Sequence, residues 1–240
     1  MIPRTIHQTW RSRDVPPRWR AYQATWSAVH PDWTYTLWTD HDCRALVAQF
    51  RPDLLGLYDS YPLPIQRADA FRYVLLASEG GLYVDLDFEC LRPLPELFDG
   101  AAVVIGVEPA SHADDAAIRS RGLSRIVCNA FMASEAGHPF WNHVLDLMSQ
   151  HPPDGSVLDT TGVFLLSQAV DSYPRQDELR IVESALLYPI TKWEVWNDLD
   201  PSVDVDRAFA VHHWSSSWQR DRLQRAALEL ARQRARRAGR

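Results

Sequence analysis

The sequence lacks the features that identify several classes of protein. No uninterrupted apolar run approaches the ~20 residues that a membrane-spanning helix needs. The first ten residues, MIPRTIHQTW, lack the apolar core of a secretory signal. Neither a Walker loop nor a Gly-x-Gly-x-x-Gly after the first expected strand is present, so both common phosphate-binding loops are excluded. Internal repeats and low-complexity linkers are also missing, so we expect no domain boundary before the C-terminal tail.

Cysteine is scarce as well. The three cysteines, Cys43, Cys90 and Cys128, are odd in number, far apart in sequence and in no metal-ligand spacing. This pattern argues against a disulfide scaffold and against a zinc site. It favours a reducing compartment, so we expect a cytoplasmic protein.

Charge is unevenly distributed along the 240 residues. The net charge of −6 includes a C-terminal segment, residues 219–240, with eight Arg against Asp221 and Glu229. The rest of the chain therefore carries −12, and a body this acidic would repel nucleic acid. The basic segment has an apolar stripe, and two interpretations stay open for it. It is either a helix packed on the body or a peripheral contact with anionic lipid.

Hydrophobic patterning predicts an α/β domain over residues 1–218, followed by the basic tail, 219–240. Strands are expected at 2–8, 33–40, 82–88, 101–107 and 125–133. Helices are expected from Pro16-Pro17 to about residue 29, from a cap at Asp40 to Phe50, and at 64–78, 138–150, 162–170 and 217–237. Alternation of strands and helices is typical of a three-layer arrangement.

The stretch EGGLYVDLDFECLRPL, residues 79–94, is the first candidate for chemistry. Asp85 and Asp87 lie two apart on the expected strand, so both carboxylates should project from the same face. Two like charges held this close are costly unless a cation lies between them, and oxygen ligands select Mg²⁺ or Mn²⁺. The sequence has four Asp-x-Asp triplets, about twice the chance number for its 22 Asp, so context must distinguish them. The second Asp-Leu-Asp, 198–200, lies in WNDLDPSVDVD, which indicates an exposed turn.

Two further features are ambiguous by themselves. Asp69 and Arg72 lie three apart on the helix before the carboxylate strand, where they form either a surface ion pair or part of a site. Ten Trp are either core residues or a stacking surface for a sugar or a base.

Several blocks together resemble a known family. They are IPRTIHQTW, HPDWTYTLWTD, QRADAFRYVLLASEGGLYVDLDFECLRPL, CNAFMASEAGHPFW, DTTGVFLLS and HHWSSSW. In this order they are similar to the glycosyltransferases with the DXD sugar-binding domain, family 32. This family includes Och1-like mannosyltransferases, α-1,4-galactosyltransferases and bacterial capsular-polysaccharide enzymes. The resemblance extends to about Trp218, and its central block, Arg67 to Asp87, is the most specific part.

The resemblance implies a GT-A fold, in which one nucleotide-binding α/β domain has a central mixed sheet flanked by helices. It implies retaining transfer of a sugar from a UDP- or GDP-sugar to a hydroxyl acceptor, with Mn²⁺ or Mg²⁺ on the pyrophosphate. The acceptor would be a glycan, a lipid-linked saccharide or a natural product. Its identity, the donor sugar, the linkage and the oligomeric state are left open.

The resemblance also implies roles for individual residues. In the catalytic set, Asp87 matches the direct metal ligand, and Asp85 matches the carboxylate shared between the metal and the donor ribose. Asp69 and Arg72 match the pair that holds the sugar hydroxyls, and Tyr83 matches an aromatic beside them.

Flanking blocks supply further donor-binding positions by the same resemblance. Trp10 matches an aromatic near the nucleotide base, and His7 and Gln8 lie on the same strand end. Positions around the transferred sugar are matched by Asn129 and by the turn Thr161-Gly162.

The closing block HHWSSSW matches a segment that covers the pyrophosphate. His212 or His213 would be a further metal or phosphate ligand, and Trp218 an indole N–H donor. Since only one of two adjacent histidines on a strand can face the site, His212 is favoured.

Two departures from the family matter. Val163 stands where many relatives have Pro after the Thr-Gly, which affects the loop on the acceptor side. The sequence also lacks the membrane anchor and lumenal disulfides of yeast and animal members, so we expect a bacterial, cytoplasmic enzyme, with membrane association only through the tail.

Two alternatives from other classes are retained. A phosphohydrolase of the haloacid-dehalogenase type also uses Asp-x-Asp at a strand end, but its motif continues Gly-Thr where this chain has Phe88-Glu89. A non-catalytic carbohydrate-binding protein would account for the Trp content without requiring paired carboxylates.

Overall fold

A computed structural model describes residues 1–114, 116–123, 125–196 and 205–215 of the chain. The expected helix at 217–237, the second Asp-Leu-Asp at 198–200, Trp218 and the basic tail lie outside the described residues.

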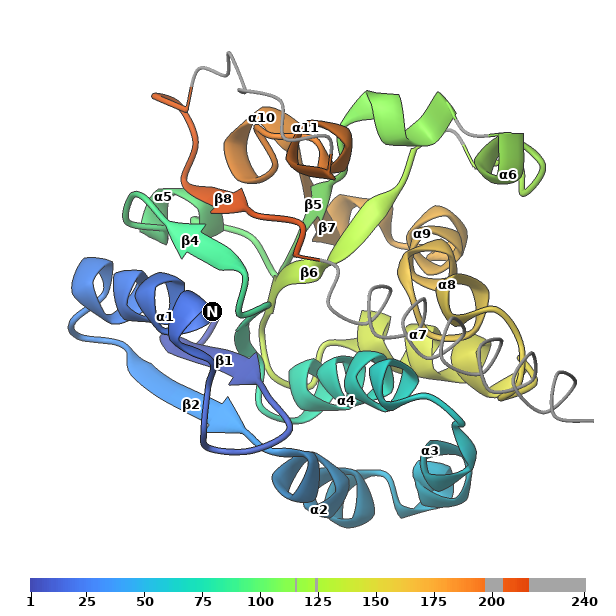
Figure 1. Ribbon diagram of the computed structural model, residues 1–240. Coiled ribbons are helices and arrows are strands. Elements are labelled where there is room, and N and C mark those ends of the chain that lie inside the picture. The colour runs from blue at the N-terminus through green and yellow to red at the C-terminus, as the bar shows by residue number, and fades with distance from the viewer. Residues whose placement is uncertain (115, 124, 197–204, 216–240) are drawn as a thin grey trace, which may run out of the picture.

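The described elements alternate between strand and helix, as expected (Figure 1). The strands are β1 (Thr5–Thr9), β2 (Thr34–Trp38), β3 (Gly81–Val84), β4 (Phe88–Cys90), β5 (Val103–Val107), β6 (Val127–Ser134), β7 (Leu179–Val182) and β8 (Ala210–His212). The longer helices are α1 (Pro17–Val29), α2 (Asp40–Phe50), α4 (Pro64–Ser78), α7 (Pro139–Ser149) and α9 (Val163–Ser172). Short helices are α3 (Leu55–Ser60), α5 (Pro95–Phe98), α6 (Ala116–Arg119), α8 (Val157–Thr160), α10 (Ser184–Leu187) and α11 (Lys192–Trp196).

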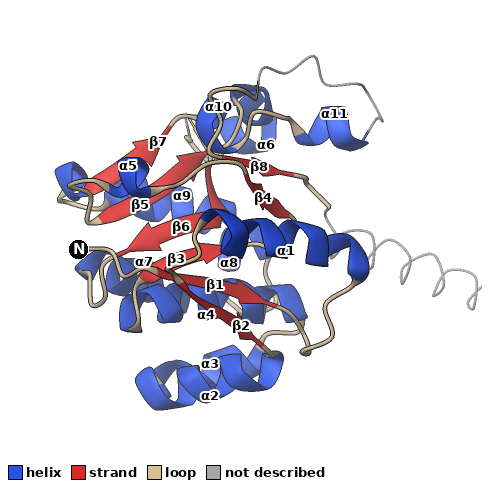
Figure 2. Ribbon diagram, turned by 90° about the vertical axis from the view of Figure 1, so that its left-hand side faces the viewer, coloured by secondary structure: helices blue, strands red, loops and turns tan. Residues whose placement is uncertain are grey.

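Six strands form the central sheet, in the order β2-β1-β3-β6-β5-β7 (Figure 2). β1 is parallel to β2 and β3, β6 is antiparallel to β3 and β5, and β5 is parallel to β7. The expected mixed sheet is therefore confirmed. β4 and β8 form a separate two-stranded antiparallel sheet that joins the carboxylate segment to the C-terminal part of the described chain.

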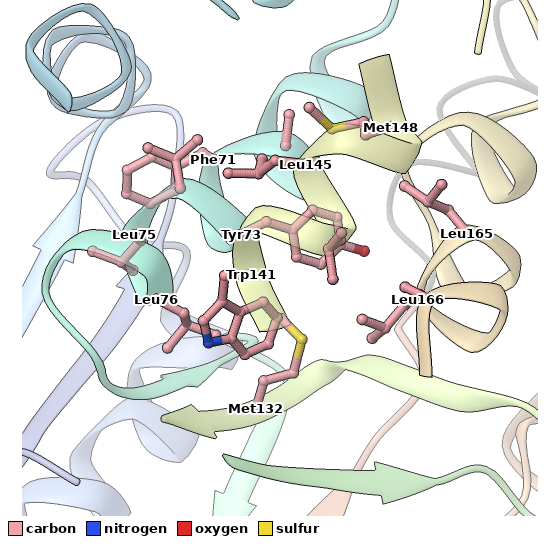
Figure 3. Packing of buried hydrophobic residues seen from close by; sticks show 14 of the residues in the cluster. Phe71, Tyr73, Leu75, Leu76, Met132, Trp141, Leu145, Met148, Leu165 and Leu166 are labelled. Atoms are coloured by element: carbon pink, nitrogen blue, oxygen red, sulfur yellow. The ribbon is translucent and has the colours of Figure 1, made fainter. Parts of the chain in front are cut away.

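Alternating side chains of the sheet divide the core in two. Tyr83, Ile105 and Met132 face a layer of α2, α4, α7 and α9, where Phe71, Trp141 and Leu165 pack (Figure 3). Leu82, Val84 and Val104 face the other layer, formed by α1, α10 and the small sheet. Among the residues whose burial is described, Trp19, Trp26, Trp141 and Trp214 are buried, so part of the tryptophan serves the core.

Two local predictions are wrong. The strand expected over 82–88 ends at Val84, and residues 85–87 form a turn before β4 begins at Phe88. Asp40 does not cap α2; the cap is Thr39, whose hydroxyl accepts from the Asp42 backbone N–H while the Asp42 carboxylate accepts from the Thr39 N–H. This reciprocal pair satisfies two backbone donors, whereas Asp40 alone would satisfy one.

Topology brings several loops to one edge of the sheet. β1, β3 and β5 run in the same direction, so the residues after their carboxyl ends, Trp10, Asp85 and Glu108, lie at the same edge. In open α/β sheets this is the edge at which ligands bind.

Candidate donor-sugar site

A cavity of about 810 Å³ lies at this edge. Its lining includes many of the residues singled out from the sequence, namely Trp10, Asp69, Arg72, Asp85, Asp87, Asn129, Gly162 and His212. They come from six different segments of the chain, so the fold brings together residues that are up to 202 positions apart in the sequence.

Asp85, Asp87 and His212 form a cluster on the cavity wall. One ligand atom from each lies within 4.8 Å of the others. Because β3 ends at Val84 and a turn follows, the two carboxylates converge through the turn and not through the same-face geometry of one continuous strand. His212 Nε2 lies 3.2 Å from Asp87 Oδ1, and the backbone N–H of Ser215 donates to Asp87 Oδ2 at 2.8 Å.

The two carboxylates differ in their electrostatic surroundings. Burial raises the pKa of Asp85 above its ordinary value; Arg72 opposes this rise and the Asp87 carboxylate adds to it. Burial acts in the same way on Asp87, but His212 and the Ser215 N–H outweigh it and bring the pKa of Asp87 down to about 2. Asp87 is therefore the carboxylate that is firmly ionised at neutral pH.

The donor set fits a divalent cation. Two carboxylates within reach of one point match the oxygen ligands that Mn²⁺ and Mg²⁺ prefer, and the imidazole is a third potential ligand. The Nδ1 atom of His212 is buried without a hydrogen-bond partner among the described residues, so only Nε2 is directed at a neighbouring carboxylate. The repulsion between Asp85 and Asp87 is the kind that a bound cation relieves.

Asp69 and Arg72 form a buried ion pair beside this cluster. Arg72 Nη2 lies 3.1 Å from Asp69 Oδ1, and Nη1 lies 3.4 Å from Asp85 Oδ1. Asp69 also accepts from Asn129 Nδ2 at 3.0 Å and from the Thr161 hydroxyl at 3.1 Å. Burial is the larger effect and raises the pKa of Asp69 to about 7 despite the nearby guanidinium. With side chains only 5% and 3% exposed, this is a fixed network and not a surface ion pair.

Several predicted residues lie behind the cavity and support it. The Tyr83 hydroxyl donates to Asp85 Oδ1 at 2.7 Å, and its ring lies under the Arg72 guanidinium. Gln8 donates to the backbone carbonyl of Asp85 at 3.1 Å. His7 lies between Trp38 and the Gly80 carbonyl, away from the cavity.

The two adjacent histidines point in different directions. His212 joins the carboxylate cluster, whereas His213 Nε2 lies 3.0 Å from Glu89 and its ring stacks on Tyr22. Of the two alternatives, the structure brings the favoured His212 to the carboxylates, and alternation along β8 directs His213 to the other side. The predicted donor Trp218 lies outside the described residues.

Sequence reasoning missed one pair in the cavity. Glu108 and His112 line it and are hydrogen-bonded to each other, with 2.8 Å between Oε2 and Nδ1. A signal was present, because Glu108 follows an expected buried strand in the same way that Asp85 does.

The mixed sheet and its flanking helices define a GT-A fold, and comparison with known proteins supports this fold class. The family described as "Glycosyltransferase sugar-binding region containing DXD motif" matches residues 16–104. The structure called "PaToxG Glycosyltransferase" has a similar fold, with a TM-score of 0.53 and 18% identity, covering 73% of this chain and 72% of that one. The chain belongs to the glycosyltransferases with the DXD-containing sugar-binding region.

Two of the curated relatives come from yeasts. "Inositol phosphoceramide mannosyltransferase 3" of Schizosaccharomyces pombe is 32% identical over 232 residues, covering 89% of this chain and 60% of that protein. "Mannosyl phosphorylinositol ceramide synthase SUR1" of Saccharomyces cerevisiae is 29% identical over 214 residues, covering 82% of this chain and 52% of that protein. The chain thus spans little more than half the length of these relatives. They are eukaryotic, so a bacterial, cytoplasmic origin stays a prediction.

Proposed function

We propose that this chain is a metal-dependent retaining glycosyltransferase that moves a hexose, mannose in the first instance, from a GDP- or UDP-sugar to a hydroxyl acceptor. One observation carries the proposal. The Asp85–Asp87–His212 cluster and the buried Asp69–Arg72 pair face the same cavity at the carboxyl edge of the sheet. The names of two relatives describe mannosyl transfer to inositol phosphoceramide, which favours mannose and an acceptor with a lipid portion.

Binding of the donor is assigned to residues of this chain. Asp85, Asp87 and His212 would hold Mn²⁺ or Mg²⁺ against the diphosphate. The cation, when bound, supplies Lewis-acid neutralisation of charge on the leaving nucleoside diphosphate. Arg72 and Asp69 hold sugar hydroxyls in fixed geometry, because their own side chains are immobilised by burial and mutual pairing.

Recognition of the nucleotide is assigned to the β1 side of the cavity. Trp10 lines the cavity, and its ring packs edge-on against Trp19 at 4.6 Å between centroids. The Arg11 guanidinium lies over the same ring at 5.2 Å from its centroid, and aromatic rings of this kind are suited to stacking on a nucleobase.

The proposal is tested by thermal stability of the full chain with UDP- and GDP-hexoses in the presence of Mn²⁺. A donor at 100 times its Kd should stabilise the protein by about 2.7 kcal/mol, and EDTA should abolish the effect. Absence of stabilisation by every donor would contradict the proposal, as would full turnover in EDTA after removal of the metal has been demonstrated.

A further inference from the structure

The part of the cavity farther from Trp10 contains a carboxylate that the proposed donor site does not use. Glu108 follows β5, and the strand order β1-β3-β6-β5 puts it and Trp10 on opposite sides of Asp85. The Glu108 N–H donates to the Ile126 carbonyl, whereas the Asp85 N–H donates to the Ala130 carbonyl. These two contacts lie four residues apart along the chain of β6, and β3 and β5 flank β6 on opposite sides, so the two backbones are roughly 16 Å apart. This separation suits a second sugar-sized group beside the donor sugar.

Hydrogen bonds determine the tautomer of His112 and therefore the bond that Glu108 accepts. The backbone N–H of Lys192 donates to His112 Nε2 at 3.2 Å, so this nitrogen carries no proton. The proton of the neutral ring is then on Nδ1, which donates to Glu108 Oε2 at 2.8 Å. Glu108 accepts this bond and retains acceptor capacity toward the cavity, where its side chain is 7% exposed.

One aromatic ring connects the Glu108–His112 pair to the proposed cation site. Trp214 lies 5.0 Å from His112 and 4.2 Å from His212 between ring centroids. Its indole N–H donates to the Ile190 carbonyl at 2.7 Å, which fixes the ring between the two histidines. The pair therefore borders the donor site directly and has a fixed position relative to it.

The wall beside Glu108 is apolar. Ile118, Ile126 and Phe164 line the cavity there and pack together as a small separate core, with Leu158 and Val163 against it. A molecule that meets this part of the cavity therefore contacts the Glu108 carboxylate, with His112 and Lys192 next to it, and a hydrocarbon surface. A hydroxyl group is suited to the carboxylate, and an alkyl portion is suited to the wall.

We propose that this region is the acceptor subsite, in which Glu108, oriented by His112, accepts a hydrogen bond from an acceptor hydroxyl and the Ile118–Ile126–Phe164 wall holds an alkyl portion of the same molecule. This proposal rests on the proposed transferase function, because only a transfer reaction has an acceptor. Binding at Glu108 is nevertheless separable from donor binding, because its residues are distinct from the Asp85–Asp87–His212 cluster.

Photocrosslinking tests the subsite on the full chain with Mn²⁺ and either UDP or GDP. The probes are octyl glucoside, galactoside and mannoside, each with a diazirine at the end of the alkyl chain. We expect labelling of α6, Ile126 or Phe164, and competition by the unmodified octyl glycoside but not by the methyl glycoside. Labelling that is absent, or confined to other regions, would overturn the proposal.

Variants link the labelling to Glu108. Glu108→Gln should lower the yield about tenfold, as expected for loss of a hydrogen bond to a charged group. The exposed carboxylate Glu96 on α5 provides the control, and Glu96→Gln should leave the yield unchanged. Phe164→Ala should also lower the labelling yield, by removing part of the apolar wall. This second variant keeps the test decisive if Glu108→Gln does not fold. Unchanged labelling in both folded variants would refute the subsite.

Nucleotide binding is measured in parallel, so that the two proposals fail separately. Stabilisation by UDP or GDP with Mn²⁺ should be the same in Glu108→Gln as in the parent. If the parent gains no stability from either nucleotide, the donor site is wrong whatever the labelling shows. If nucleotides bind and labelling fails, only the acceptor subsite is wrong.

Discussion

At the residue scale, His212 and His213 differ in their contacts although they are adjacent in the sequence. Both are histidines on or directly after β8, yet only His212 reaches the carboxylate cluster, while His213 pairs with Glu89. Sequence alone favoured His212 because alternating side chains face opposite ways, but it could not exclude the other orientation. Which of the two side chains faces the cavity depends on the pairing of β4 with β8, which joins residues at least 120 positions apart.

The two histidines make a matched pair of variants. His212→Ala should weaken Mn²⁺ binding at least about tenfold, since even outer-shell partners of metal ligands cost 10–100-fold. His213→Ala should leave the Mn²⁺ affinity within about twofold. Calorimetric titration with Mn²⁺ measures both, and a larger loss in His213→Ala would contradict the assigned cluster.

Asp69 gives a prediction about pH. Its pKa is about 7 in the folded chain and ordinarily 3.8, so the folded state holds the proton more tightly. The stability that protonated Asp69 contributes is complete below pH ~4 and is lost as pH rises through ~7. The variant Asp69→Asn has no titrating group at this position. The free energy of unfolding of the variant minus that of the parent should therefore increase from pH 4.5 to pH 8. Urea unfolding in EDTA at both pH values measures this difference, and a difference independent of pH would refute the assignment.

At the scale of elements, two consecutive glycines lead from α4 into β3. Gly80 has φ +65 directly after α4, and Gly81 has φ +84 at the first position of β3. What the sequence could not show is the end of β3 at Val84. The pattern of Leu82, Val84, Leu86 and Phe88 continues through the turn, and only the contacts of β4 with β8 and α1 separate the segments. The Asp85–Asp87 pair was therefore found for a partly wrong geometric reason.

Gly80→Ala tests the turn that leads into the carboxylate segment. A Cβ at Gly80 would lie 2.5 Å from the Ala136 backbone N, whereas Gly100, with φ +66, has nothing within 4 Å of the added atom. Gly100→Ala should therefore cost only backbone strain, about 1–2 kcal/mol. Gly80→Ala should cost about 2 kcal/mol more, because backbone must also move. Equal losses in guanidinium unfolding would show that the close approach at Gly80 is not present.

At the scale of the whole molecule, the sequence predicted the α/β class, the mixed sheet and the family. These follow from hydrophobic patterning and from motifs in fixed order. The sequence did not predict β7 or the Glu108–His112 pair. The orientation of His112 depends on a hydrogen bond from the Lys192 backbone N–H, which is 80 residues away in the sequence. Among the described residues, no helix is long and apolar enough to span a bilayer.

The basic tail, residues 219–240, remains a hypothesis about the whole chain. If it binds anionic lipid at about 1 kcal/mol per basic residue near the surface, the full chain should sediment with phosphatidylserine liposomes at low salt. A variant ending at residue 218 should stay in the supernatant. Equal pelleting of the two proteins would exclude a membrane role for the tail.

Turnover of the donor by Asp87→Asn tests the central claim, that the Asp85–Asp87–His212 cluster is the donor site of a glycosyltransferase. The substitution keeps the shape but removes the charge, and loss of a contribution on the order of 4 kcal/mol to the transition state should lower Mn²⁺-dependent turnover roughly a thousandfold. The folded state should persist with a modest loss of stability, because Asp87 receives hydrogen bonds from His212 and the Ser215 N–H. Asp200→Asn, in the second Asp-Leu-Asp, should change turnover by less than about twofold. Normal turnover in Asp87→Asn, together with an inactive Asp200→Asn, would contradict the account.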